Sequence, residues 1–211
     1  MIPIKELLIF ALAAFGLVIT PGPNMIYLIS CSITQGRWAG FISLAGVVVG
    51  FLVHILLVSF GLTAVLFTIP YAYLILKSLG VCYLLYLAVQ SVLPRGRGIF
   101  EIREDLKADK PGKLLSMGFL TSALNPKIAV FYLSFFPQFI KIENGSVLTQ
   151  SLELGFTQML VSFSINLLIV LTAAKVAEWF AKNPFWVRIQ KWFMASVLSG
   201  LAIKMALDKG K

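Results

Sequence analysis

The sequence contains little charge. Only 13% of its 211 residues are Asp, Glu, Lys or Arg, whereas a soluble domain has about a quarter. No acidic residue occurs between Glu6 and Glu101, and 59% of the chain is hydrophobic. A chain with so few charges cannot cover a soluble fold with polar surface. The composition therefore predicts a protein that lies in lipid.

Residues for metal binding and covalent chemistry are scarce too. The single histidine, His54, and the two cysteines, Cys31 and Cys82, form no metal-ligand pattern. The sequence has no phosphate-binding loop, which excludes a nucleotide-driven pump. A nucleophile–base pair within the apolar segments is also missing, which argues against an intramembrane enzyme. We expect neither a cofactor nor a metal.

Long hydrophobic runs are what the chain has instead. A helix needs about 20 apolar residues to cross a bilayer, and these runs are too long for the short strands of a barrel. The first run resembles a secretory signal, but Glu6 follows Lys5 and the run continues too far, so we interpret it as a retained span. The six predicted helical spans are Ile4–Cys31, Gly40–Phe67, Tyr71–Leu93, Leu114–Ile140, Val147–Ala174 and Phe185–Leu207.

The net charge of +9 follows membrane topology rather than a nucleic-acid partner. Most basic residues lie in connections that the six spans place on one side: Arg37, Arg95, Arg97, Arg103, Lys107, Lys110, Lys113, Lys175, Lys182, Arg188 and Lys191. The positive-inside rule places this side in the cytoplasm and both termini outside. We expect a multi-pass protein of the bacterial inner membrane, with the loop 94–113 cytoplasmic and attracted to anionic lipid.

Two of the predicted spans are interrupted in their middle. Residues 20–24 read TPGPN in the first span, and residues 121–127 read TSALNPK in the fourth. Proline lacks a backbone donor and clashes with the preceding turn, so each segment must open its helix. The freed backbone groups are tolerated at membrane depth only where protein or a cavity satisfies them. A packing kink is the alternative explanation of each break.

The breaks occupy the first span of each half, which predicts an inverted repeat. An odd number of spans per half reverses the orientation of the second half. The fold class is therefore all-α and polytopic, with two inverted three-helix repeats whose first helix is broken. We expect repeats at 1–93 and 114–211, joined by the charged linker 94–113. Broken helices at matching places indicate a transporter's binding site near the bilayer midplane.

Several segments resemble the lysine-exporter (LysE/RhtB) family. They are TPGPNMIYL (20–28), QGRWAGFISLAGVVVGFLVH (35–54), LKSLGVCYLLYLA (76–88) and GFLTSALNPKIAVFYLSFFPQFI (118–140). The resemblance implies secondary active export of amino acids, driven by a proton or ion gradient. Its two motifs imply that the substrate-binding residues are Pro21, Gly22, Pro23, Asn24, Asn125, Pro126 and Lys127.

Lys127 directly follows the second break, deep in its span. A charge there must face a cavity or an acceptor, so we expect it to receive a substrate carboxylate or to pair with freed carbonyls of the first break. Snorkelling to the interface is the alternative. Weaker candidates for coupling or pore lining are Lys77, His54 and Asn166; Lys77 could equally snorkel, and a lone His is more often a packing residue.

Family members that export basic amino acids are described as having an acidic residue in span two. This sequence has no acidic residue there, and Gly46 and Gly50 lie around that position. This departure favours a neutral amino acid. Together with Gly40, these glycines permit close helix packing within the chain or in a homodimer. The rival function is a small channel or a lipid-handling membrane protein.

Overall fold

The computed structural model describes residues 1–20, 22–68 and 109–182, together with scattered positions between 78 and 89 and between 185 and 207. Within these residues every regular element is a helix, which confirms the all-α class. The elements are α1 (Ile4–Ile19), α2 (Pro23–Thr34), α3 (Gly36–Thr68), α5 (Pro111–Ala123), α6 (Pro126–Phe135), the 3₁₀ turns η1 (Phe136–Gln138) and η2 (Ile142–Asn144), and α7 (Val147–Lys182).

Two of these helices are long and apolar enough to cross a membrane: α3 over Gly36–Gly61 and α7 over Val147–Ala173. Two bent pairs qualify when each is taken as one span, so the described residues hold up to four spans. α1 and α2 meet at 56°, and α5 and α6 at 43°. The predicted third and sixth spans lie largely outside the described residues. The six-span inverted repeat and its boundaries therefore stay predictions.

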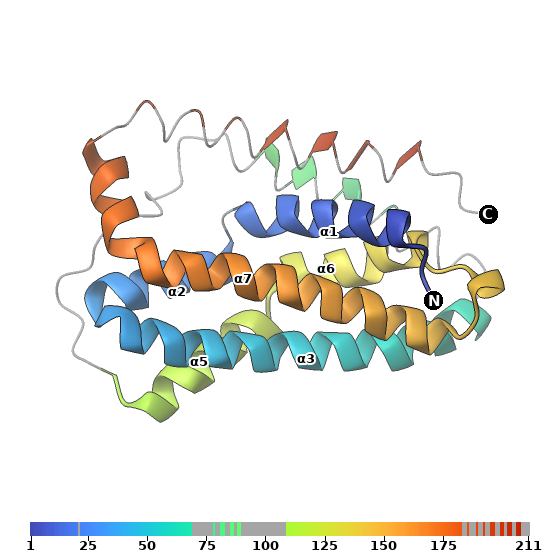
Figure 1. Ribbon diagram of the computed structural model, residues 1–211, viewed down its shortest axis with the longest axis horizontal. Coiled ribbons are helices and arrows are strands. Elements are labelled where there is room, and N and C mark those ends of the chain that lie inside the picture. The colour runs from blue at the N-terminus through green and yellow to red at the C-terminus, as the bar shows by residue number, and fades with distance from the viewer. Residues whose placement is uncertain are drawn as a thin grey trace.

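The long helices form one bundle. Figure 1 shows α1, α3 and α7 running along the long axis of the molecule, with α2 and α5 towards one end. α7 packs against α1, α2 and α3, and α3 packs against α5. A buried aromatic cluster joins α1 to α6 and η1, with the ring centroids of Phe10 and Phe136 5.3 Å apart. This cluster holds the two bent pairs in one core.

Glycines bring α3 and α5 into backbone contact. A Cβ atom on Gly46 would lie 2.1 Å from the Leu115 carbonyl oxygen, and one on Gly118 would lie 2.1 Å from the Ser43 carbonyl oxygen. Only a residue without a side chain fits at such distances, and small residues are the usual means of close helix contact in membranes. Gly46 therefore serves internal packing. A homodimer stays a prediction.

Candidate functional site

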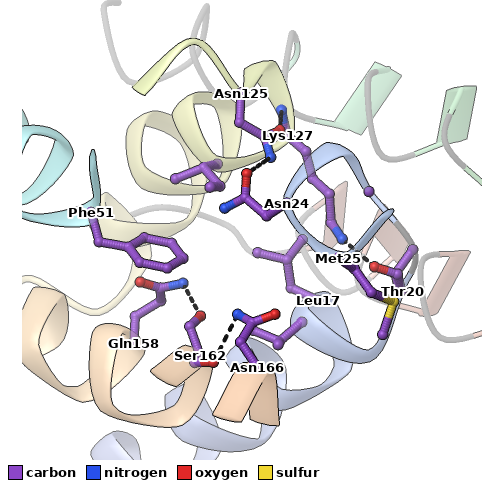
Figure 2. A pocket seen from close by; sticks show the side chains of 13 residues that line it. Leu17, Thr20, Asn24, Met25, Phe51, Asn125, Lys127, Gln158, Ser162 and Asn166 are labelled. Atoms are coloured by element: carbon purple, nitrogen blue, oxygen red, sulfur yellow. Dashed lines mark hydrogen bonds between the residues drawn. The ribbon is translucent and has the colours of Figure 1, made fainter. Parts of the chain in front are cut away.

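The two helix breaks lie against each other in the core of the bundle. α1 ends at Ile19 and α2 begins after Gly22, while α5 ends at Ala123 and α6 begins after Asn125. The Asn125 side-chain nitrogen donates to the Asn24 side-chain oxygen at 3.1 Å, across 101 residues of sequence (Figure 2). Both side chains are buried. The two interrupted segments thus form one site.

Asn125 also organises its own break. Its side-chain oxygen accepts a hydrogen bond from the Lys127 backbone N–H at 3.0 Å, so it acts as the N-cap of α6. This cap uses the oxygen and leaves the nitrogen for Asn24. The Asn-Pro pair is suited to the place, because asparagine caps the helix and proline needs no donor at the first helical position.

Lys127 reaches across to the first break. Its Nζ donates to the Thr20 carbonyl oxygen at 2.6 Å, and only 7% of the residue is exposed. Thr20 is the C-cap of α1, where unpaired carbonyls and the helix dipole favour a cation. We expected Lys127 to bind a substrate carboxylate or to pair with a freed carbonyl of the first break. The contact observed is the second of these, with the Thr20 carbonyl. Among the described residues the ion pairs are Lys113–Asp109 and Lys141–Glu6. Lys127 therefore has no counter-ion within the described part of the chain.

Gly22 makes room for this lysine. A Cβ atom there would lie 3.3 Å from Lys127 Cδ and 3.4 Å from Nζ. The Gly22 backbone is extended, at φ −154° and ψ 177°, which any residue can adopt. The glycine is therefore needed for space beside the lysine side chain rather than for its backbone freedom.

His54 hydrogen-bonds a carbonyl at the second break, as Lys127 does at the first. Its Nε2 lies 3.0 Å from the Ser122 carbonyl oxygen in the last turn of α5. Because a carbonyl can only accept, Nε2 must carry the proton. The imidazole also stacks on Tyr132, with centroids 5.8 Å apart. His54 is buried behind the site and is not among the residues that line its cavity.

A polar face of α7 lies opposite the breaks. Gln158, Ser162 and Asn166 are spaced four residues apart and are all buried. Gln158 Nε2 donates to Ser162 Oγ at 2.7 Å, and Asn166 Nδ2 donates to the Ser162 carbonyl at 2.8 Å. Sequence analysis had singled out Asn166 alone. The available signal was the repeat of polar residues at helical spacing inside an apolar span.

These elements line a small, partly open cavity of about 30 Å³, enough for about two water molecules. Figure 2 shows its polar side chains converging from α2, α6 and α7. An amino acid would need the helices to separate. Among the residues that the structure describes, the lining includes no acid and is formed by Leu17, Val18, Thr20, Gly22, Asn24, Met25, Phe51, Asn125, Lys127, Ile128, Gln158, Ser162 and Asn166.

The structure therefore brings together five of the predicted site residues: Gly22, Asn24, Asn125, Lys127 and Asn166 line the cavity. Pro23 and Pro126 begin the helices α2 and α6 beside them. Pro21 and Lys77 lie outside the described residues. The geometry offers one cation, several amides and an apolar wall.

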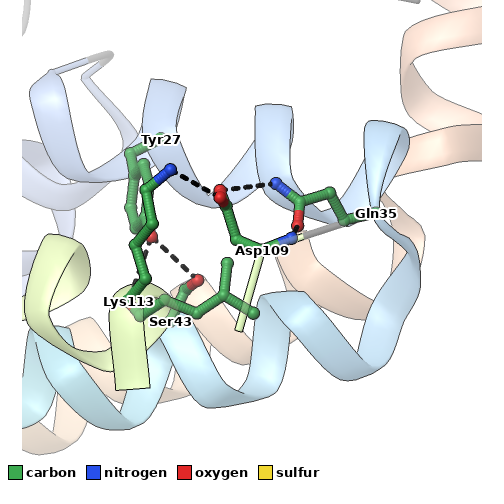
Figure 3. A network of polar contacts seen from close by, with 6 residues as sticks. Tyr27, Gln35, Ser43, Asp109 and Lys113 are labelled. Carbon is green, nitrogen blue, oxygen red and sulfur yellow. Dashed lines mark hydrogen bonds and ion pairs between the residues drawn. The ribbon is translucent and has the colours of Figure 1, made fainter. Parts of the chain in front are cut away.

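Polar contacts join the C-terminal end of α2 to the residues at the start of α5 (Figure 3). Gln35 Nε2 donates to Asp109 Oδ2 at 3.1 Å, the Asp109 N–H donates to Gln35 Oε1 at 2.6 Å, and Lys113 Nζ donates to Asp109 Oδ1 at 2.6 Å. We call these three residues the loop-side clasp. The hydrogen bonds from Lys113 and then from Gln35 lower the pKa of the Asp109 carboxyl.

A second set of contacts lies at the other end of the α1–α2 pair. Lys141 Nζ donates to Glu6 at 2.7 Å, and the Ile2 N–H donates to Glu153 at 3.1 Å. The hydrogen bond to Glu6 raises the pKa of Lys141. The cavity thus lies between polar contacts at both ends of the bundle.

Comparison with known proteins gives a consistent picture. The family model for LysE type translocators matches residues 15–209. The chain is 28% identical to a leucine efflux protein of Enterobacter sp. (strain 638), over 93% of each chain. It is 26% identical to a leucine efflux protein of Klebsiella pneumoniae, over 94% of this chain and 93% of the relative. No solved structure matches the chain.

Proposed function

The chain belongs to the LysE type translocator family, and on that premise we propose that it exports neutral amino acids through the cavity between its two helix breaks. It is a transporter and not an enzyme. The relatives are named for leucine efflux, which makes leucine the first substrate to test.

One observation carries the assignment of the site: the buried Lys127 ammonium lies on the cavity and has no carboxylate partner among the described residues. An ammonium has three donors, and the Thr20 carbonyl is the acceptor observed for one of them. The first turns of α2 and α6 also line the cavity, and helix N-termini favour anions. A substrate carboxylate would bind between these groups.

The apolar part of the lining supports a neutral substrate. Leu17, Val18, Met25, Phe51 and Ile128 form this part, which suits an aliphatic side chain. A lysine or arginine side chain would bring a second cation into a cavity whose described lining contains no acidic residue. Burying such an unpaired charge costs several kcal/mol, so basic amino acids are disfavoured.

Transport requires the cavity to open alternately to the two sides of the membrane. We propose that a proton or ion gradient drives this cycle, with the loop-side clasp facing the cytoplasm and the termini outside. Because the cavity holds about 30 Å³, the helices must separate for an amino acid to enter.

The test is efflux of a panel of amino acids from dipeptide-fed cells that express the protein. We expect one or a few neutral amino acids to accumulate outside, and Lys127→Met to lower this efflux about thirtyfold or more, the usual cost of removing one partner of a buried charged contact. Lys110→Met is the matched control, because Lys110 is exposed. If no amino acid accumulates while the protein is in the membrane, the proposal fails; an ion conductance would then indicate a channel.

A further inference from the structure

A zwitterionic substrate has an ammonium group as well as a carboxylate, and the proposed function leaves the ammonium unassigned. We propose that the polar face of α7 binds it, with Asn166 Oδ1 as the contact and with the Ser162 backbone carbonyl fixing the direction of the Asn166 amide. This inference rests on the proposed function and deepens it.

Burial is the first argument. Gln158, Ser162 and Asn166 are 1%, 0% and 4% exposed, and all three line the cavity. Polar side chains inside a membrane span are costly and characteristically mark substrate pathways. Ser164, on the same helix, is exposed and bonds only its own helix, at the Leu160 carbonyl. The polar groups of this face are therefore directed at the cavity rather than at lipid.

Hydrogen bonding fixes the direction of the Asn166 amide. Its nitrogen bonds the Ser162 carbonyl oxygen, which can only accept, so the amide cannot be turned round. The side-chain oxygen must then point away from Ser162, as Figure 2 shows. Asn166 presents an acceptor to the cavity.

Gln158 is engaged differently. Its side-chain oxygen accepts from the Tyr132 hydroxyl at 2.6 Å while its nitrogen donates to Ser162 Oγ. Tyr132 is fully buried and stacks on His54. Gln158 is therefore held from both sides, with its oxygen and its nitrogen both engaged within the protein, so the acceptor offered to a ligand is that of Asn166.

The Lys127 ammonium and the Thr20 carbonyl, at the C-terminus of α1, lie beside each other on the cavity. Lys127 Nζ donates to this carbonyl, so its capacity to accept from an ammonium is seen directly. Neutral acceptors are sufficient for a substrate ammonium, because the substrate's own carboxylate balances the charge.

The test compares L-leucine with 4-methylpentanoate, which keeps the carboxylate and the side chain but lacks the ammonium. Binding is measured calorimetrically on the full-length protein in lipid nanodiscs. We expect the wild-type protein to prefer leucine about tenfold or more, as a hydrogen bond to a charged group implies. Asn166→Leu should weaken leucine binding about tenfold and leave 4-methylpentanoate unchanged.

Two further variants guard against a trivial loss of fold. Asn166→Gln keeps the amide, with its donor and its acceptor oxygen, and should retain the preference for leucine. Ser164→Leu places the same new side chain on the exposed face of α7 and should change neither affinity. Lys127→Met should weaken both ligands, because both have the carboxylate.

Three results would overturn the inference. The first is an equal affinity of the wild-type protein for the two ligands, and the second is an unchanged preference for leucine in Asn166→Leu. The third is an equal loss of affinity for both ligands in the Asn166 variants, which would indicate that Asn166 has a structural role only. Each of these leaves amino-acid export standing. If the wild-type protein binds no amino acid at all, the proposed function itself fails and this inference with it.

Discussion

The two helix breaks contain similar residues but are completed in different ways. At the second break Asn125 caps α6 with its own side chain, whereas Gly22 at the first break gives α2 no side-chain cap. The bend is 56° at the first break and 43° at the second. The helix that follows the second break is thus capped by its own break segment, whereas the helix that follows the first break has no side-chain cap.

The side chains that donate hydrogen bonds to the carbonyls at the ends of α1 and α5 also differ between the two breaks. The Thr20 carbonyl accepts from Lys127, a buried cation on the cavity, while the Ser122 carbonyl accepts from His54, which lies behind the cavity. At the proposed site a substrate carboxylate would compete for Lys127, whereas His54 does not line the cavity. We therefore expect the first break to respond to substrate and the second to act as a fixed support.

The largest effect should come from detaching the second break from α3. Gly118→Leu places a side chain where a Cβ atom alone would lie 2.1 Å from the Ser43 carbonyl oxygen. Overpacking against backbone costs more than the usual few kcal/mol of a tight core, so we expect no folded protein by size-exclusion chromatography in detergent. Gly112→Leu, on the same helix with no atom within 4 Å, should fold normally; aggregation of both variants would refute this account.

The second-largest effect should be the difference in efflux between variants of the two donors, Lys127 and His54. Lys127→Met should lower amino-acid efflux about thirtyfold or more, whereas His54→Phe should lower it less than about threefold. His54→Phe removes one hydrogen bond from the Ser122 carbonyl, which still accepts from the Asn125 N–H, so it should reduce the free energy of unfolding by about 0.5–1.5 kcal/mol. Efflux and thermal unfolding of the purified variants measure the two effects. A folded His54→Phe protein without transport would show that His54 takes part directly, as in proton coupling.

A smaller effect separates the two asparagines. Asn125→Ala removes both the cap of α6 and the bond to Asn24, and the cap alone contributes about 0.5–2 kcal/mol. Asn24→Ala removes only the bond between the side chains, a loss of about 1 kcal/mol. Unfolding in denaturant should rank Asn125→Ala as less stable, with a coupling in the double variant of about 0.5 kcal/mol or more. Additive effects would mean that the breaks do not support each other.

The smallest effect concerns the loop-side clasp. Asp109→Asn removes the charge that Lys113 contacts, and it should increase maleimide labelling of the buried Cys31 about twofold to fivefold, as the loss of an exposed ion pair implies. Cys82, which is exposed, is first replaced by serine. An unchanged labelling rate would show that the clasp does not cover Cys31.

The pH dependence of this clasp has a definite sign. Because the folded pKa of Asp109 is lowered, its contribution is complete above the ordinary aspartate pKa of about 4 and is lost only as the pH falls through the lower folded value. The ratio of Asp109→Asn to wild-type labelling should therefore stay constant from about pH 6 to pH 8. A ratio that changes over this range would contradict the assigned titration.

Much of the local structure was predictable. The break at residues 20–24 was expected, and α1 and α2 are separated there; the break at 121–127 was expected, and α5 and α6 are separated at Leu124 and Asn125. The span expected at Val147–Ala174 is the apolar part of α7. Gln158 lines the cavity but was not among the predicted site residues, because its place there depends on contacts with other helices, such as its hydrogen bond with Tyr132.

By itself the sequence determined that this is a helical membrane protein and where its helices break. Both follow from local physics: a long apolar run must form a helix in lipid, and proline cannot continue one. Only the tertiary structure decided which freed groups meet. A carbonyl released at Thr20 has no partner in its own segment, and its donor lies 107 residues away in Lys127. Such a pairing depends on how the whole bundle packs, because the helix ends can meet only after the helices have assembled.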